Sequence, residues 1–399
     1  MPQTVTTEKF VTAPAAYVYR AFTNATVLRE WLCDLATVAP RPGGRMYLWW
    51  HGEFYSNGEY MAVEENKSVT FKWFSRVDPV PTQVTVTLQE KDGGTLVTLA
   101  HTVPDGDDWA QRAEGFKQEW ESSLYNLVSV LETGLDLRTF NRPMLGININ
   151  DFNAEIAHQL GVPVTDGLRL DTVLEGMGAH AAGLRKDDVI ISLGGKAITN
   201  DYGTLVAALQ GEKGGDKVEV VFYRGSEKKT VSMELSRRPI PKVPFDAAEL
   251  AKQVAAENEA AYAELAKSFE GVAEARASQR PLSTQWSAKE VLAHLIHSER
   301  YMQFLVEDMI ASQEKWSDDW SGNVETHIRA TVKAFPTVQA LLEEYKLLLD
   351  ETHAFIAAFP AEFVARKGTY FRAAAMLLNW KDHTLSHVDQ IKAALKAAR

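Results

Sequence analysis

The spacing of hydrophobic positions changes twice along the chain. Residues 1–138 predict short strands followed by a long helix, residues 139–241 predict short strands with more glycine, and the rest predicts mostly helix. No repeat relates the three parts. We therefore expect a multidomain α+β protein with domains over residues 1–138, 139–241 and 242–399.

The first part alternates β-branched and aromatic residues with turn signals. This pattern predicts strands over residues 46–50, 69–74, 82–88 and 95–101. A long helix is then predicted over residues 111–134, with Gly134 as its C-cap. Its apolar positions recur at spacings of three and four: Phe116, Trp120, Leu124, Leu127 and Leu131.

Large rings concentrate in this first part. Residues 1–138 hold 18 of the 39 aromatic side chains, nearly half of them in a third of the chain. Strand alternation places Tyr47 and Trp49 on one face of a strand and Trp50 on the other. Both faces therefore carry large rings, and one of them is expected to pack on the long helix.

Composition excludes several classes of protein. The chain has 42 Lys+Arg and 53 Asp+Glu, a net charge of −11, and 45% hydrophobic residues, which are ordinary values for a globular protein. The negative field disfavours nucleic acid as a partner. The single cysteine, Cys33, excludes an intrachain disulfide and a cysteine-based zinc site. The first residues lack a signal-peptide pattern. No run of apolar residues reaches the ~18–20 that a membrane-spanning helix needs. We therefore expect a cytoplasmic protein without membrane contact.

The first part resembles a known superfamily. The segments FVTAPAAYVYRAFTNATVLREWLCD, RPGGRMYLWW and GGTLVTLAH, and the final amphipathic helix, resemble the START-like (SRPBCC) proteins. Within that group they are similar to homologues of the activator of the ninety-kilodalton heat-shock protein ATPase. The positions that match are Ala13-Pro14, Trp31, Gly43-Gly44, Gly58 and Gly94-Thr95.

This resemblance implies a helix-grip fold, an antiparallel sheet wrapped round a long helix with an apolar cavity between them. We expect an apolar small molecule in a pocket lined by Trp31, Trp49, Trp73 and Trp120. The alternative is that the rings only form a core. The family usually has Gly-Trp at the last helix, whereas this chain has Glu119-Trp120.

The middle part resembles a second family. The segments PMLGININDFNAEIAHQLG, GLRLDTVLEGMGAHAAGLRKDDVIISLGGKAIT and GGDKVEVVFYRGSEKKTVSMEL, over about 143–236, are similar to a PDZ domain of the HtrA type. The resemblance implies a groove for the C-terminus of a peptide or protein, which adds as a strand. The carboxylate-binding loop is then Met144, Leu145, Gly146 and Ile147, where backbone N–H groups turn toward one point.

The middle part also departs from that family. His180 and Asp187 stand where the family often has proline and glycine. Aspartate tolerates the left-handed backbone better than most residues, so Asp187 is compatible with the turn. The alternative to peptide binding is a groove filled by a neighbouring domain.

A proline-rich linker and four long helices complete the prediction. RRPIPKVP at 237–244 has three prolines in eight residues. Helical patterns then cover about 246–274, 288–313, 337–358 and 370–397, which predicts a four-helix bundle. The second helix has a clear start, because Ser287 and Glu290 form a capping-box pattern.

Histidines lie at helical spacing in two of these helices. His294 and His297 are one turn apart, and His383 and His387 are four apart, so each pair shares a helix face. Two imidazoles on one helix and a third on a facing helix suit Zn²⁺ or Ni²⁺. The alternative for each histidine is an ordinary hydrogen-bonded residue.

The last part resembles the DinB-like (YfiT) metal-dependent bundles in its WS-x-x-EVL-x-H start and its H-x-x-x-H helix. This resemblance assigns the divalent metal to His294, His383 and His387, with His297 as a spare candidate. Tyr301 and Gln390 are expected on the metal-facing side. Some members of this family resemble thiol transferases or hydrolases, and others have no known reaction.

The sequence leaves two classes of function open. Glu299 and Asp382 lie off the histidine face, so no general base is evident. We therefore expect a stress-related binding or adapter protein, which can also form a homodimer. The alternative is a metal-dependent hydrolase or thiol transferase that works at the three histidines.

Overall fold

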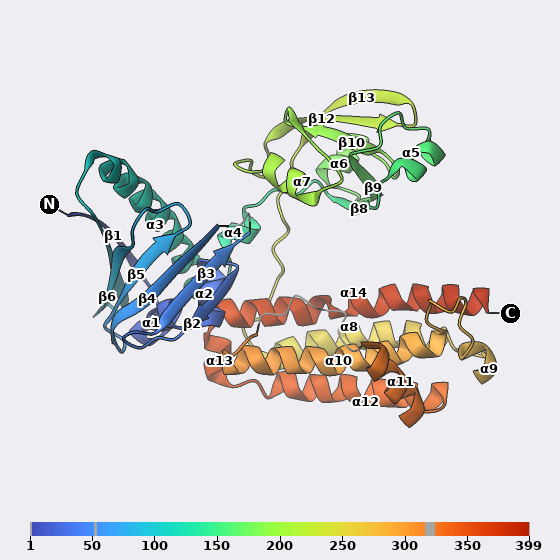
Figure 1. Cartoon of the computed structure of the whole chain (residues 1–399). Helices are drawn as coiled ribbons and strands as arrows, with labels where there is room; N and C mark the ends of the chain where they lie inside the picture. The colour runs from blue at the N-terminus through green and yellow to red at the C-terminus, as the bar shows by residue number, and fades with distance from the viewer. Residues whose placement is uncertain (1, 52–53, 316–323, 399) are drawn as a thin grey trace. The chain divides into compact units, whose positions relative to one another are not determined.

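A computed structural model describes residues 2–51, 54–315 and 324–398 (Figure 1). The chain divides into two compact units, Met1–Asp136 with Lys242–Arg399, and Leu137–Pro241. The first unit therefore contains the predicted first and last domains together. Within the described ranges, no helix has the length and apolar character needed to cross a bilayer.

The first domain is built on one antiparallel sheet with the strand order β1-β7-β6-β5-β4-β3-β2. Its strands are β1 (Gln3–Val11), β2 (Leu35–Val38), β3 (Arg45–Trp50), β4 (Phe54–Glu64), β5 (Ser68–Ser75), β6 (Thr82–Lys91) and β7 (Gly94–Val103). Its helices are α1 (Ala15–Thr23), α2 (Ala25–Trp31) and α3 (Asp107–Thr133). The four predicted strands are confirmed as β3, β5, β6 and β7.

The long helix α3 packs against β1 and β7 (Figure 1). It begins four residues before the predicted start, because Asp107 and Asp108 stabilise its N-terminus through the helix dipole. Gly134 ends the helix with a left-handed φ of 85°, as predicted. The buried face of α3 includes Trp120 and Leu124, which join the sheet in one core.

The middle domain contains a second antiparallel sheet, in the order β13-β12-β10-β9-β8, with β11 paired to β10. Its strands are β8 (Ile147–Asn150), β9 (Leu168–Val173), β10 (Val189–Leu193), β11 (Lys196–Ala197), β12 (Lys217–Arg224) and β13 (Glu227–Glu234). Its helices are α4 (Leu137–Phe140), α5 (Ala154–Leu160), α6 (Gly178–Ala181) and α7 (Tyr202–Ala208). Asp187 has the left-handed φ of 68° that the sequence allowed, and Arg169 donates to its carboxylate at 2.6 Å.

The last domain is a bundle of four long helices that run side by side (Figure 1). They are α8 (Ala247–Lys267), α10 (Ala288–Ala311), α12 (Val338–Ala357) and α14 (Lys367–Ala397), and the short helices are α9 (Glu274–Ala277), α11 (Val324–Ala334) and α13 (Ala361–Ala365). The first predicted helix was too long. Its chain turns at Gly271, which has a φ of 69°, and continues as α9.

The first domain and the bundle meet through buried charge. Glu30 on α2 is 3% exposed and accepts from Thr369 Oγ1 at 2.6 Å and from Arg372 Nη2 at 3.2 Å, both on α14. Gly368 allows this approach, because a Cβ there would lie 2.5 Å from Glu30 Oε2. Arg372 also donates to Glu314 Oε2 at 2.5 Å. A compact unit therefore joins two domains that are separated by about 100 residues in the sequence.

Candidate functional site

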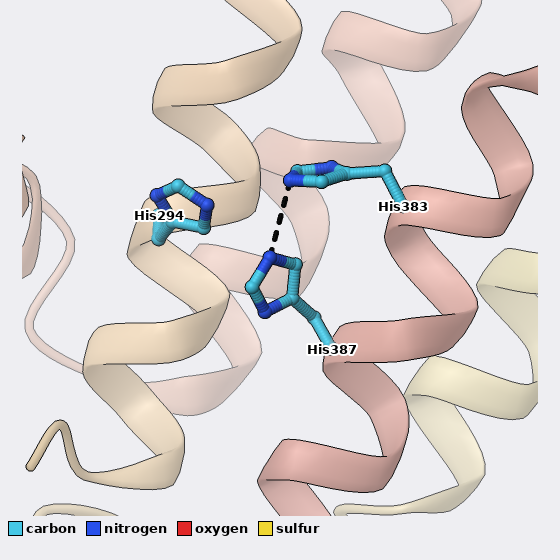
Figure 2. Close-up of side chains that lie close together, drawn as sticks. All are labelled: His294, His383 and His387. Carbon is cyan, nitrogen blue, oxygen red and sulfur yellow. Dashed lines mark hydrogen bonds between the residues drawn. The ribbon is translucent and has the colours of Figure 1, made fainter. Parts of the chain in front are cut away.

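Three histidines converge between two helices of the bundle. Figure 2 shows His294 on α10 facing His383 and His387 on α14. One nitrogen from each imidazole lies within 4.8 Å of the others, a grouping that suits a single metal ion. Among the described residues, this is the one set of three or more potential metal ligands that lie this close together.

Local sequence explains how the helices hold these side chains. The spacing of His383 and His387 places them one turn apart on α14, and α10 packs against α14. The predicted capping box is confirmed, since Ser287 Oγ accepts from Glu290 N and Glu290 accepts from Ser287 N. This cap fixes the start of α10 at Ala288, six residues before His294.

The hydrogen bonds at the histidines define which nitrogens are free. His387 Nδ1 lies 2.7 Å from Gln390 Oε1, so Nδ1 donates and Nε2 keeps its lone pair. That Nε2 lies 3.1 Å from His383 Nε2. The Nδ1 atoms of His294 and His383 are buried without a partner among the described residues. A divalent ion fits this donor set, because three neutral imidazoles meet here and no charged group of the protein bonds to them.

The electrostatic environment keeps the three imidazoles neutral. Burial, and then the neighbouring His387 and His383, lower the pKa of His294 to about 3. Burial, and then His387, lower the pKa of His383 to about 4. Burial also lowers the pKa of His387. Neutral imidazole is the form that binds a metal, and the lowered pKa values keep His294 and His383 in that form well below pH 6.5.

Two tryptophans flank the histidines, and a carboxylate anchors each indole. The Trp286 ring lies 5.1 Å from the His294 ring, and Trp286 Nε1 donates to Glu325 Oε2 at 3.0 Å. The Trp380 ring lies 5.1 Å from the His383 ring, and Trp380 Nε1 donates to Glu299 Oε2 at 3.0 Å. The indoles therefore border the histidines in fixed orientations.

Sequence reasoning missed the role of Glu299. It is fully buried, it accepts from Thr352 Oγ1 at 2.6 Å, and burial raises its pKa to about 7. Each of its oxygens accepts one hydrogen bond, from Thr352 and from Trp380, so the carboxylate holds the Trp380 indole in place. Its signal was its place in a buried row at spacings of three and four: Leu292, Leu295, Glu299, Met302 and Val306.

The remaining candidates on the bundle have other partners. His297 stacks on His327 of α11, with ring centroids 4.4 Å apart, so it lies outside the group of three. Gln390 lies beside the site as predicted, as the hydrogen-bond partner of His387. Tyr301 is half-buried on α10.

The structure brings together three of the four predicted pocket tryptophans in the first domain. Trp31, Trp73 and Trp120 belong to one buried core, and the rings of Trp73 and Trp120 lie 5.3 Å apart. The ring centroids of Trp49 and His51 lie 4.9 Å apart, and Trp49 is not part of that core. Trp50, on the opposite face of β3, packs on Trp73 at 6.0 Å instead. The indole Nε1 of Trp73 is buried without a partner among the described residues.

A buried histidine adds polarity to the same interior. Trp120 Nε1 donates to His101 Nδ1 at 3.1 Å, and His101 Nε2 lies 2.7 Å from Thr82 Oγ1. Burial lowers the pKa of His101 to about 4, so the ring is neutral at pH 7. The unpartnered Trp73 N–H therefore remains the free polar group in this aromatic interior.

The predicted carboxylate loop lies beside a free sheet edge in the middle domain. Strand β8 ends the sheet, so its outer edge has no partner strand among the described residues. The N–H groups of Leu145 and Gly146 make no hydrogen bond to any described residue, whereas Met144 N donates to Ser236 O at 2.8 Å. Ile149 on β8 and Val206 on α7 are 40% and 50% exposed. The loop can therefore offer the N–H groups of Leu145 and Gly146 to a carboxylate, whereas the N–H of Met144 already donates to Ser236 O.

Family models match three successive segments of the chain. Residues 12–132 match the model described as activator of Hsp90 ATPase homolog 1-like protein, residues 143–235 match the PDZ domain, and residues 257–391 match the DinB superfamily. The histidine group lies in the third segment and the carboxylate loop in the second.

Relatives of known sequence or structure each cover one part of the chain. A probable periplasmic serine endoprotease DegP-like protein of Marinomonas sp. is 32% identical over 25% of this chain and 21% of its own length. A serine protease Do-like HtrA of Lactococcus lactis subsp. cremoris is 31% identical over 39% of this chain and 35% of its own length. The chain thus spans about a fifth to a third of the curated relatives it matches.

Among solved structures, an Aha1 dimer from Colwellia psychrerythraea is 18% identical, covering 33% of this chain and 96% of that one, with a TM-score of 0.28. The family models by themselves give the order of domains along the chain: a START-like AHSA1 domain, a PDZ domain and a DinB-superfamily domain.

Proposed function

We propose that this protein is a cytoplasmic, stress-related adapter that holds one divalent metal ion, Zn²⁺ or Ni²⁺, at His294, His383 and His387. The convergence of three neutral imidazoles from two helices carries the proposal. Such a donor set belongs to borderline divalent ions and leaves a further coordination position. In this reading the metal holds α10 against α14 and presents a site between Trp286 and Trp380.

Titration of the metal-free full chain tests this proposal. Calorimetry with Zn²⁺ and with Ni²⁺ is expected to give one ion per chain and a higher unfolding temperature, because the ion binds only the folded arrangement. Binding of neither ion at micromolar concentration contradicts the proposal. Binding with a stoichiometry that does not change when His387 is replaced by glutamine contradicts the assignment of the ligands.

The alternative function is a metal-dependent hydrolase or thiol transferase. Three protein ligands leave a position at which a metal supplies a water of lowered pKa. We keep the adapter as the first proposal because Glu299, one of the two carboxylates that the sequence offered, points its oxygens at Thr352 and Trp380. Ester or thiol-transfer turnover by the metal-loaded chain that disappears in His383→Gln would establish the enzyme.

The proposed adapter also binds the C-terminus of a peptide or protein at the PDZ domain. Three features support this role: the free edge of β8, the unused N–H groups of Leu145 and Gly146, and the exposed apolar side chains of Ile149 and Val206. A peptide carboxylate would accept from the two amides while the last residues of the peptide pair with β8.

The first domain of the proposed adapter binds an apolar ligand. The buried, unpartnered Nε1 of Trp73 supports a ligand with one hydrogen-bond acceptor.

Amidation of the peptide tests the carboxylate loop. Selection from a library of peptides with free C-termini is expected to yield ligands for the full chain, and amidation should weaken each by about 10-fold or more, since a charge-assisted hydrogen bond is lost. The variant Val206→Asp should weaken the apolar contact, while Val77→Asp, at an exposed position in the first domain, should leave affinity unchanged. Equal affinity for acid and amide forms contradicts carboxylate recognition.

A further inference from the structure

Two arginines meet at the junction between the first domain and the bundle. Arg20 on α1 donates from Nη2 to Ser312 Oγ at 2.5 Å, and Arg366, which precedes α14, donates to the same oxygen. Both guanidinium groups therefore lie within hydrogen-bond distance of one hydroxyl oxygen. Two cations this close repel each other in a partly buried site unless an anion offsets their charge.

No carboxylate in the described part of the chain makes direct contact with this pair. Among the described residues, neither Arg20 nor Arg366 forms an ion pair, and the Nε atoms of both are buried without a hydrogen-bond partner. Arg366 Nη2 donates only to a backbone carbonyl, Ile310 O, at 2.6 Å. Burial, and then the charge of Arg20, lower the pKa of Arg366, while the smaller effects of Glu362 and Glu30 raise it.

The junction has an excess of positive charge. Its carboxylates are Glu30 and Glu314, both engaged by Arg372, and Glu362, which acts on Arg366 without an ion pair. The cations outnumber them by two: Arg20, Arg29, Arg366, Lys367 and Arg372. The helix ends do not remove this excess, because the negative C-terminus of α10 and the positive N-terminus of α14 both lie here and offset each other.

A small cavity lies beside the arginine pair. Its volume is about 20 Å³, and its charged lining consists of Arg20, Arg366 and Lys367 together with Glu30, whose oxygen is shared by Thr369 and Arg372. A space of this size holds one water molecule or one monatomic ion, and is too small for a phosphate or sulfate.

We propose that Arg20 and Arg366 bind one halide-sized monovalent anion, of which chloride is the probe, in this cavity. The anion offsets the repulsion between the two guanidinium groups and so holds α1 of the first domain against the bundle. The site is independent of the three histidines, which lie farther along α14.

The expected signature is a chloride response that depends on Arg20. Unfolding temperatures of the full chain are measured in sodium chloride and in sodium gluconate of equal ionic strength, since gluconate is too large for the cavity. Wild type should gain about 2 °C or more in chloride, with saturation. Arg20→Gln should lose this gain, and in gluconate it should equal or exceed wild type, because one of two repelling charges is gone. Arg41→Gln, an exposed control, should behave as wild type.

Direct binding is measured by the chloride-35 nuclear magnetic resonance linewidth. Wild type should broaden the line and bromide should reverse the broadening, whereas Arg20→Gln and Arg366→Gln should abolish it. Equal broadening by wild type and both variants overturns the proposal. A chloride-induced rise in unfolding temperature that is no larger in wild type than in Arg20→Gln also overturns it, because water alone would then fill the cavity. Tighter binding of phosphate than of chloride would overturn the halide-sized assignment.

Discussion

Arg372→Met is expected to lower the free energy of unfolding of the full chain by about 3–5 kcal/mol at pH 7.5. The substitution keeps the apolar volume but leaves Glu30 and Glu314 buried at the junction without their shared cation. An unpaired buried carboxylate loses its hydration and gains nothing in return. Removal of one partner is therefore costlier here than at any exposed ion pair of the chain.

The pH dependence of this effect has a definite sign. Burial, offset in part by Arg372, already raises the pKa of Glu30, and removal of Arg372 raises it further. A carboxyl with a raised pKa in the folded state destabilises the fold when pH exceeds that pKa, and does so less once it is protonated. The difference between wild type and Arg372→Met should therefore shrink as pH falls from 7.5 toward 4.5.

Two measurements check this prediction. Urea unfolding at both pH values gives the free energies, and Arg300→Met is the matched control, because Arg300 pairs with Glu344 while 44% exposed and should cost less than about 1 kcal/mol. Near-ultraviolet circular dichroism, dominated by the ring-rich first domain, and far-ultraviolet circular dichroism, dominated by the helical bundle, should show one transition in wild type and two in Arg372→Met. A loss equal to that of Arg300→Met would show that the junction does not depend on this charge.

The junction also marks the limit of prediction from the sequence. Strands and helices were predictable because alternation and helical spacing are local, and the His383–His387 pair is local in the same way. Glu30 and Arg372 are 342 positions apart, and no local pattern connects them. Each resembles an ordinary surface charge until the two domains are placed together.

The orientation of individual helix and strand faces was also beyond local prediction. Alternation placed Trp49 and Trp50 on opposite faces of β3 correctly, but nothing local indicates which face meets the core; Trp50 packs on Trp73 there, and Trp49 lies outside it. Glu299 was set aside because it lies off the histidine face. It occupies a buried position of α10 instead, where Thr352 and Trp380 satisfy its oxygens.

His383→Gln is expected to weaken binding of the divalent ion by at least about 100-fold at pH 7, since loss of a ligand exceeds the ~10–100-fold cost of losing a ligand's hydrogen-bond partner. The rise in unfolding temperature that the ion gives wild type should disappear with it. His353→Gln is the matched control. His353 lies on α12 of the same bundle, and its Nε2 lies 3.3 Å from Asn258 Nδ2, away from the three histidines.

Wild type should keep the ion at a pH where ordinary imidazoles are charged. Burial lowers the pKa of His294 to about 3 and of His383 to about 4, so protons compete for these ligands only near those values, against about 6.5 for an exposed histidine. Calorimetry with Zn²⁺ at pH 7.0 and 5.5 should therefore give affinities within about 10-fold of each other. A histidine site in ordinary solvent would lose about one power of ten per pH unit for each protonated ligand. A loss of several hundred-fold at pH 5.5, or full affinity in His383→Gln, would mean that the ion binds at exposed side chains and that the buried histidines serve only to pack α10 against α14.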